Sequence, residues 1–152
     1  MPLIEGSVDI SAPRQAVWDL ICDVSRYPEI GNMADETVLI SEGSFGEGSV
    51  YSETGKVAGM KSTSEWTVTR FDPPAIQTHV GGDRSMRGEI TWTLDEIAPG
   101  TTRASLVAEF TMMPKFRPLG VVLEWLFVKR MMTREIGHIR AGLKRIAEAE
   151  ST

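Results

Sequence analysis

The sequence predicts an α+β fold in a single domain that spans residues 1–152. The length of 152 residues is typical of one domain. Between Ile4 and Met113, apolar and polar residues alternate with period two over several short segments, as in strands with one solvent-facing side. Pro118–Glu150 instead has the spacing of a long helix. We therefore expect a strand, a short helical region, about six further strands and a long terminal helix.

The N-terminal segment predicts a strand followed by a short helix. Apolar residues alternate with polar ones over Ile4–Ile10, which indicates a half-buried strand. Ser11-Ala12-Pro13 supplies a capping hydroxyl and a proline suited to a first helical turn. The apolar spacing over Ala16–Val24 then predicts a helix, and Tyr27-Pro28 marks the end of this region.

The middle of the chain predicts an antiparallel sheet. Turn residues separate the expected strands, which are Thr37–Ser41, Ser49–Val57, Ser62–Phe71, Ile76–Val80, Met86–Asp95 and Arg103–Met112. The glycine-rich run Gly43–Gly48 lacks the Gly-Lys-Ser/Thr ending of a phosphate-binding loop, and no helix follows it. We therefore expect a hairpin turn there.

The terminal helix has two parts of different character. Leu119–Val128 is apolar nearly all round, so it needs packing partners on several sides. The remainder narrows to one apolar stripe, formed by Met132, Ile136, Ile139, Leu143 and Ile146. This helix alone is long enough to cover the apolar face of the sheet. Because one helix cannot fill a broad, curved sheet, we expect an apolar cavity between them.

Composition and charge exclude several classes of protein. The net charge of -5 argues against general nucleic-acid binding, which depends on neutralising phosphates. Cys22 is the only cysteine, so no internal disulfide can form. The N-terminus has no secretory pattern, and Leu119–Val128 is about half the length of a membrane span. We expect a cytoplasmic protein without a transmembrane segment. His79, His138 and Cys22 lack zinc-site spacing, so we expect no metal and no cofactor.

Short motifs along essentially the whole chain carry a family resemblance. They are Ser11–Pro13 with Val17-Trp18, Asp23–Pro28, Gly48–Val50, Trp66–Pro74, Trp92–Leu94, Pro99–Thr102 and Leu143–Glu148. In this order and spacing they resemble the START-like, polyketide cyclase/dehydrase superfamily (SRPBCC). The resemblance implies the helix-grip fold of START and Bet v-like proteins. In that fold a curved antiparallel sheet of about seven strands wraps around a long C-terminal helix, and short helices follow the first strand.

The resemblance implies a pocket between sheet and helix for a hydrophobic or amphipathic small molecule, such as a lipid, polyketide or isoprenoid. Relatives include lipid carriers, aromatase/cyclases, coenzyme-Q-binding proteins and toxin components. A carrier or sensor is therefore the first expectation, and a cofactor-independent aromatase/cyclase or dehydrase is the alternative. A further alternative is an interaction protein, such as the toxin component of a toxin–antitoxin pair. The motifs mark fold landmarks, so the catalytic residues stay unassigned and the balance favours a binding protein.

Inward-facing positions supply the candidate ligand-binding wall. These residues are Trp66, Ile90, Trp92, Leu106, Phe110, Leu123 and Phe127. Each would also serve as ordinary core, and we expect several to do both. Arg84 shares the inward phase of Met86, so its guanidinium is a candidate partner for a ligand carboxylate or phenolate. A salt bridge to Asp83 or plain solvent exposure is the alternative for Arg84.

Other polar residues have less certain positions. Tyr51 and His79 could donate or accept protons, but their strand phases do not identify the face on which they lie. Three glutamates fall opposite the inward phase and are expected to face solvent: Glu65, Glu89 and Glu109. Met113–Pro118 is expected to be a plain connection, with a lid or membrane-touching edge as the alternative. A homodimer and transient membrane contact stay open.

Overall fold

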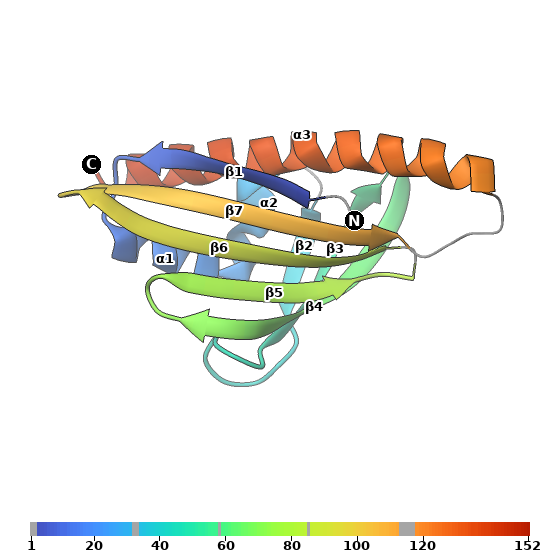
Figure 1. The fold of residues 1–152 in the computed structure, drawn as a ribbon. Coiled ribbons are helices and arrows are strands. Elements are labelled where there is room, and N and C mark those ends of the chain that lie inside the picture. The colour runs from blue at the N-terminus through green and yellow to red at the C-terminus, as the bar shows by residue number, and fades with distance from the viewer. Residues whose placement is uncertain (1–2, 32–33, 58, 85, 113–117) are drawn as a thin grey trace.

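In the computed structural model, a seven-stranded antiparallel sheet curves around a long C-terminal helix (Figure 1). The structure describes residues 3–31, 34–57, 59–84, 86–112 and 118–152, without the side chains of residues 57, 112 and 118–124. The strands are β1 (Leu3–Ile10), β2 (Ala34–Leu39), β3 (Val50–Val57), β4 (Met60–Asp72), β5 (Ile76–Gly82), β6 (Met86–Ala98) and β7 (Thr101–Met112). The helices are α1 (Arg14–Cys22), the short 3₁₀ helix η1 (Val24–Arg26), α2 (Tyr27–Ile30) and α3 (Pro118–Glu150).

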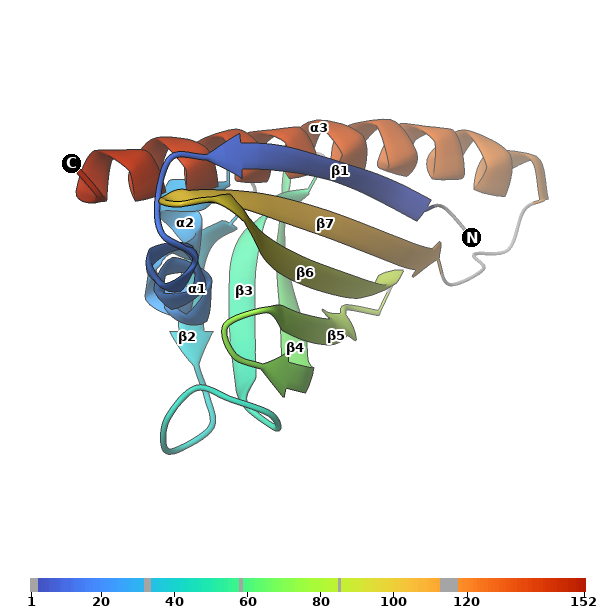
Figure 2. The same cartoon turned by 60° about the vertical axis from the view of Figure 1, so that its left-hand side comes forward.

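The sheet has the strand order β1-β7-β6-β5-β4-β3-β2. Strands β2 to β7 follow one another as hairpins, while β1 pairs with β7 and places Leu3 opposite Glu109. The run Gly43–Gly48 lies between β2 and β3, and the positive φ of Gly43 and Gly48 fits the expected turn. Figure 2 shows the sheet turning from β1 and β7, which run beside α3, to β3, which stands across it. The predicted α+β fold class is confirmed.

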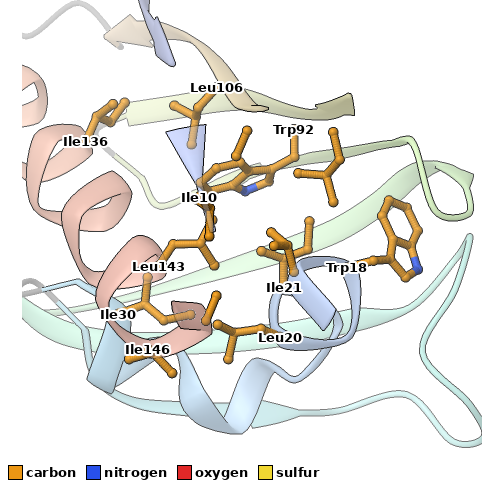
Figure 3. Close-up of a cluster of buried hydrophobic side chains, with 14 of the residues drawn as sticks. Ile10, Trp18, Leu20, Ile21, Ile30, Trp92, Leu106, Ile136, Leu143 and Ile146 are labelled. Carbon is orange, nitrogen blue, oxygen red and sulfur yellow. The ribbon is translucent and has the colours of Figure 1, made fainter. Parts of the chain in front are cut away.

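The apolar stripe of α3 packs into the core. Ile136 and Leu143 are fully buried, Ile146 is buried, and Met132 and Ile139 are partly buried. Figure 3 shows the C-terminal part of this stripe among side chains of α1 and α2, including Leu20, Ile21 and Ile30. The predicted role of the stripe as cover for the sheet is confirmed. Side chains of α1 and α2 thus join the core beneath the C-terminal half of α3.

A glycine allows α3 to approach α2 closely. A Cβ atom at Gly142 would lie 2.0 Å from the carbonyl oxygen of Ile30, which is part of the α2 backbone. Real Cβ atoms do not come this close to backbone atoms, so a side chain at position 142 would push the helices apart. Gly142 therefore sets the distance between α2 and α3.

Two local expectations differ from the structure. Ser11 does not cap α1, because the helix begins at Arg14 and Pro13 holds the N-cap position. The backbone amide of Ser11 instead donates to Oε1 of Glu148 at the end of α3, at 2.9 Å. Leu126 and Phe127 lack the expected packing partners and are 52% and 57% exposed. The reason is length, because the N-terminal end of α3 projects beyond the strands (Figure 1).

Among the described residues, no helix combines the length and the apolar character that a membrane span requires.

Candidate functional site

A cavity lies between the curved sheet and α3, with further wall residues from α1 and α2. The space open to the centre of a water-sized sphere is about 160 Å³. One water molecule needs roughly 10–15 Å³ on this measure, so the cavity can hold a small organic molecule. The position agrees with the cavity predicted from the sequence.

Gly88 makes room for the aromatic floor of the cavity. Trp66, Gly81, Gly88 and Phe110 lie side by side across β4, β5, β6 and β7. A Cβ atom at Gly88 would lie 2.8 Å from the Phe110 ring and 3.2 Å from the Trp66 ring. Both rings therefore fold over Gly88. Trp66 and Phe110 both line the cavity and form the aromatic part of its floor.

The rest of the apolar wall comes from the neighbouring sheet positions and from α3. Ile90, Trp92 and Leu106 continue the floor on β6 and β7. The opposite wall is formed by one face of α3, with Met132, Ile136 and Ile139. The indole nitrogen of Trp66 donates to Oγ of Ser64 at 2.9 Å, so this buried ring brings no unpaired donor into the cavity.

Most of the predicted wall residues reach the cavity. Those that line it are Trp66, Ile90, Trp92, Leu106 and Phe110. Phe127 does not, because it lies on the exposed face of α3. Because the start of α3 is apolar nearly all round, the sequence did not show that Phe127 faces solvent while Met132 faces the cavity. The side chain of Leu123 lies outside the described residues.

Arg84 also lies outside the cavity wall and is exposed. β5 ends at Gly82, and Arg84 sits in the bend before β6. The period-two phase of β6 therefore does not extend to this residue. Asp83 lines the cavity instead, and its carboxylate accepts hydrogen bonds from Oγ of Ser62 at 2.9 Å and the Met86 amide at 3.0 Å.

A chain of buried hydrogen bonds borders the cavity. Nε2 of His79 lies 2.7 Å from Oε1 of Gln77, which can only accept, so Nε2 carries the proton. Nδ1 of His79 is then the acceptor for the Tyr51 hydroxyl, at 2.7 Å. Burial lowers the pKa of His79 to about 4 and raises that of Tyr51 well above its usual range. Both groups are therefore neutral at neutral pH.

Two glutamates from different elements also face the cavity. Glu53 lies on β3, opposite Ser64 of β4, and Glu135 lies on α3 with only 7% of its surface exposed. Burial, followed by the negative charge of Glu135, raises the pKa of Glu53 to about 7. Glu53 can therefore gain or lose a proton under ordinary conditions, or pair with a cation.

The sequence analysis missed Glu53 and Glu135, although each leaves a signal. Glu53 shares the strand phase of Tyr51 and Gly55, which also line the cavity. Glu135 lies three residues after Met132 and four before Ile139, at the edge of the apolar stripe. The predicted solvent-facing glutamates are exposed, as expected: Glu65, Glu89 and Glu109. Within the described ranges, no group of three or more His, Cys, Asp or Glu side chains is placed to hold a metal ion.

Solved structures share this fold at low sequence identity. A START superfamily protein from Mycobacterium smegmatis is 12% identical, with a TM-score of 0.78 over 97% of this chain and 98% of its own. A protein from Thermus thermophilus is 19% identical, with a TM-score of 0.77 over 99% of this chain and 100% of its own. The Zhui aromatase/cyclase from Streptomyces sp. R1128 is 19% identical, with a TM-score of 0.69 over 99% of this chain and 98% of its own.

A search of curated proteins finds no match. A family model described as "Polyketide cyclase / dehydrase and lipid transport" matches residues 1–149. This match spans every strand of the sheet and all but the last residue of α3. The chain therefore belongs to the polyketide cyclase / dehydrase and lipid transport family.

Proposed function

We propose that this protein binds a hydrophobic or amphipathic small molecule in the cavity and acts as a carrier or sensor. The observation that carries the proposal is the open volume of about 160 Å³ within a largely apolar wall. Protein interiors are normally packed without voids much larger than a water molecule. A cavity of this size loses packing contacts unless a ligand supplies them. The family description, which includes lipid transport, supports the same class of ligand.

The test is a titration with the neutral, polarity-sensitive dye N-phenyl-1-naphthylamine. Trp66 and Trp92 line the cavity, so a bound dye should quench their fluorescence with saturation in the micromolar range. Ile90→Phe, which adds bulk inside the cavity, should weaken dye binding at least tenfold. Val107→Phe is the matched control, because Val107 lies on β7 and is 39% exposed. Absence of saturable binding by the folded wild-type protein would overturn the proposal.

A second candidate function is that of an aromatase/cyclase. The observation in its favour is Glu53, whose pKa of about 7 suits proton transfer at neutral pH. Tyr51 and His79 line the same cavity. The Zhui structure and two di-domain ARO/CYC structures are similar folds.

A synthetic poly-β-ketone thioester tests this function. In the reaction an enol carbon attacks a ketone carbonyl, a C–C bond forms, and water leaves. The wild-type protein should accelerate ring closure, and Glu53→Gln should reduce the rate at least a hundredfold if Glu53 moves the proton. No acceleration by the wild-type protein would exclude the reaction for this substrate class, while leaving ligand binding intact.

A further inference from the structure

Acidic side chains contribute to the wall of the cavity. Glu53 from β3, Glu135 from α3 and Asp83 from the β5–β6 bend all contribute to its wall. No lysine or arginine occurs among the described residues that line it. The rest of the wall is largely apolar, so these carboxyl groups face a medium that solvates charge poorly.

The three carboxyl groups are not equally satisfied. Asp83 accepts hydrogen bonds from Ser62 and Met86. Glu135 has His138 nearby, with its Oε2 at 3.7 Å from Nδ1 of the imidazole. For Glu53, the described parts of the chain provide no hydrogen-bond donor and no ion-pair partner to its carboxylate. Glu53 is partly buried, and its side chain lines the largely apolar cavity. A carboxylate in such surroundings is poorly solvated, and a bound cation would stabilise its ionised form.

We infer that the ligand of this cavity carries a protonated amine on an apolar body, with the ammonium group against Glu53 and the apolar body over Trp66 and Phe110. This inference rests on the proposed function and specifies its ligand class. It reverses the expectation attached to Arg84, which favoured an anionic ligand. A ligand carboxylate beside Glu53 would be repelled by the negative charges of Glu53 and Glu135 in a medium that screens charge weakly.

The inference makes binding depend on pH. The titratable groups around Glu53 are Glu135 and His138 from α3, Tyr27 from α2, Tyr51 from its own strand, His79 from β5 and Asp83 from the bend. Burial and Glu135 together raise the pKa of Glu53 to about 7, so the empty site is partly protonated at neutral pH.

An ammonium group favours the ionised carboxylate, so its binding releases a proton from Glu53. Alkylamines remain protonated up to about pH 10. Amine affinity should therefore rise severalfold between about pH 6 and pH 8, in step with ionisation of Glu53.

The experiment compares three ligands of nearly equal shape by isothermal titration calorimetry. They are 2-(1-naphthyl)ethylamine, 1-naphthylacetic acid and 2-(1-naphthyl)ethanol. The amine should bind at least tenfold more tightly than the acid. Glu53→Gln should weaken amine binding about ten- to a hundredfold and leave the alcohol nearly unchanged, because the charge is lost and the shape is kept. Glu65→Gln is the matched control, since it removes one exposed carboxylate from β4.

Each outcome decides the inference. Amine preference that is lost in Glu53→Gln and retained in Glu65→Gln supports it. Equal binding of all three ligands, or tightest binding of the acid, overturns it while leaving the proposed function standing. Failure of the amine to bind when the neutral dye does bind also overturns it. Failure of the dye and of all three ligands overturns the proposed function itself.

Discussion

The hydroxyl group of Tyr51 on β3 donates a hydrogen bond to Nδ1 of His79 on β5, with 2.7 Å between the two atoms. β4 lies between these two strands, so the contact spans the strand that separates them. Both side chains are buried, at 4% and 3% exposure. The contact therefore joins β3 to β5 beside the cavity that both residues line.

Tyr51→Phe should lower the free energy of unfolding by about 1–3 kcal/mol. The substitution keeps the ring and leaves Nδ1 of His79 as a buried acceptor without a donor. Urea denaturation near pH 7 measures the change. A double-mutant cycle with His79→Phe should give a coupling of at least about 0.5 kcal/mol. Strictly additive effects would show that the hydrogen bond contributes nothing to stability.

His79 and Glu53 should make the free energy of unfolding depend on pH in opposite directions. Folding lowers the pKa of His79 from 6.5 to about 4, because burial disfavours the charged imidazole. Its contribution to the free energy of unfolding is therefore present near neutral pH and is lost as the pH falls from about 6.5 to 4. Folding raises the pKa of Glu53 from 4.5 to about 7. Its contribution to the free energy of unfolding is therefore present at low pH and is lost as the pH rises from about 4.5 to 7. The two dependences oppose each other between about pH 4.5 and 6.5.

Glu53→Gln should leave His79 as the main source of the pH dependence of the free energy of unfolding in this range. One pKa unit corresponds to about 1.4 kcal/mol, so each group changes the free energy of unfolding by roughly 3 kcal/mol across its window. The variant should lose stability on acidification from about pH 6.5 to 4.5 more steeply than the wild-type protein. Urea titrations at several pH values provide the measurement. Parallel curves for the two proteins would contradict the raised pKa of Glu53.

Two glycines of α3 should respond oppositely to alanine. A Cβ atom at Gly137 meets nothing within 4 Å, so Gly137→Ala should raise the free energy of unfolding by about 0.5–1 kcal/mol through helix propensity. At Gly142 the added atom would lie 2.0 Å from the Ile30 carbonyl oxygen. Gly142→Ala should therefore destabilise the protein by about 2 kcal/mol or more. Thermal melting of the pair is the test, and equal effects would contradict the α2–α3 contact.

Two leucines in different parts of α3 should differ in how much their replacement by alanine destabilises the protein. Leu143 is 0% exposed within the core, so Leu143→Ala should cost about 2–5 kcal/mol. Leu126 is 52% exposed, so Leu126→Ala should change the free energy of unfolding by no more than about 0.5 kcal/mol. Chemical denaturation compares them directly. A large cost at Leu126 would mean that a second molecule covers this end of the helix.

The elements of the fold could be predicted because their signals are local. Alternation over Ser62–Phe71 identifies a strand since successive side chains of a strand point to opposite faces. β4 covers all of that segment. The stripe from Met132 to Ile146 identifies a helix face for the same kind of reason. The cavity could be predicted because the sequence contains only one helix long enough to cover the broad sheet, and one helix cannot fill the concave face of that sheet.

The sequence by itself determined the order of the strands and helices, the inward phase of Trp66 and Phe110, and the family resemblance. Only the tertiary structure decided which polar side chains border the cavity. Arg84 shares a phase with Met86 but lies in a bend, and Glu53 shares one with Tyr51 and lies beneath α3. The environment of a side chain depends on which distant element covers it, and the packing of α3 against the sheet sets that environment. The local sequence pattern around a residue does not contain this information.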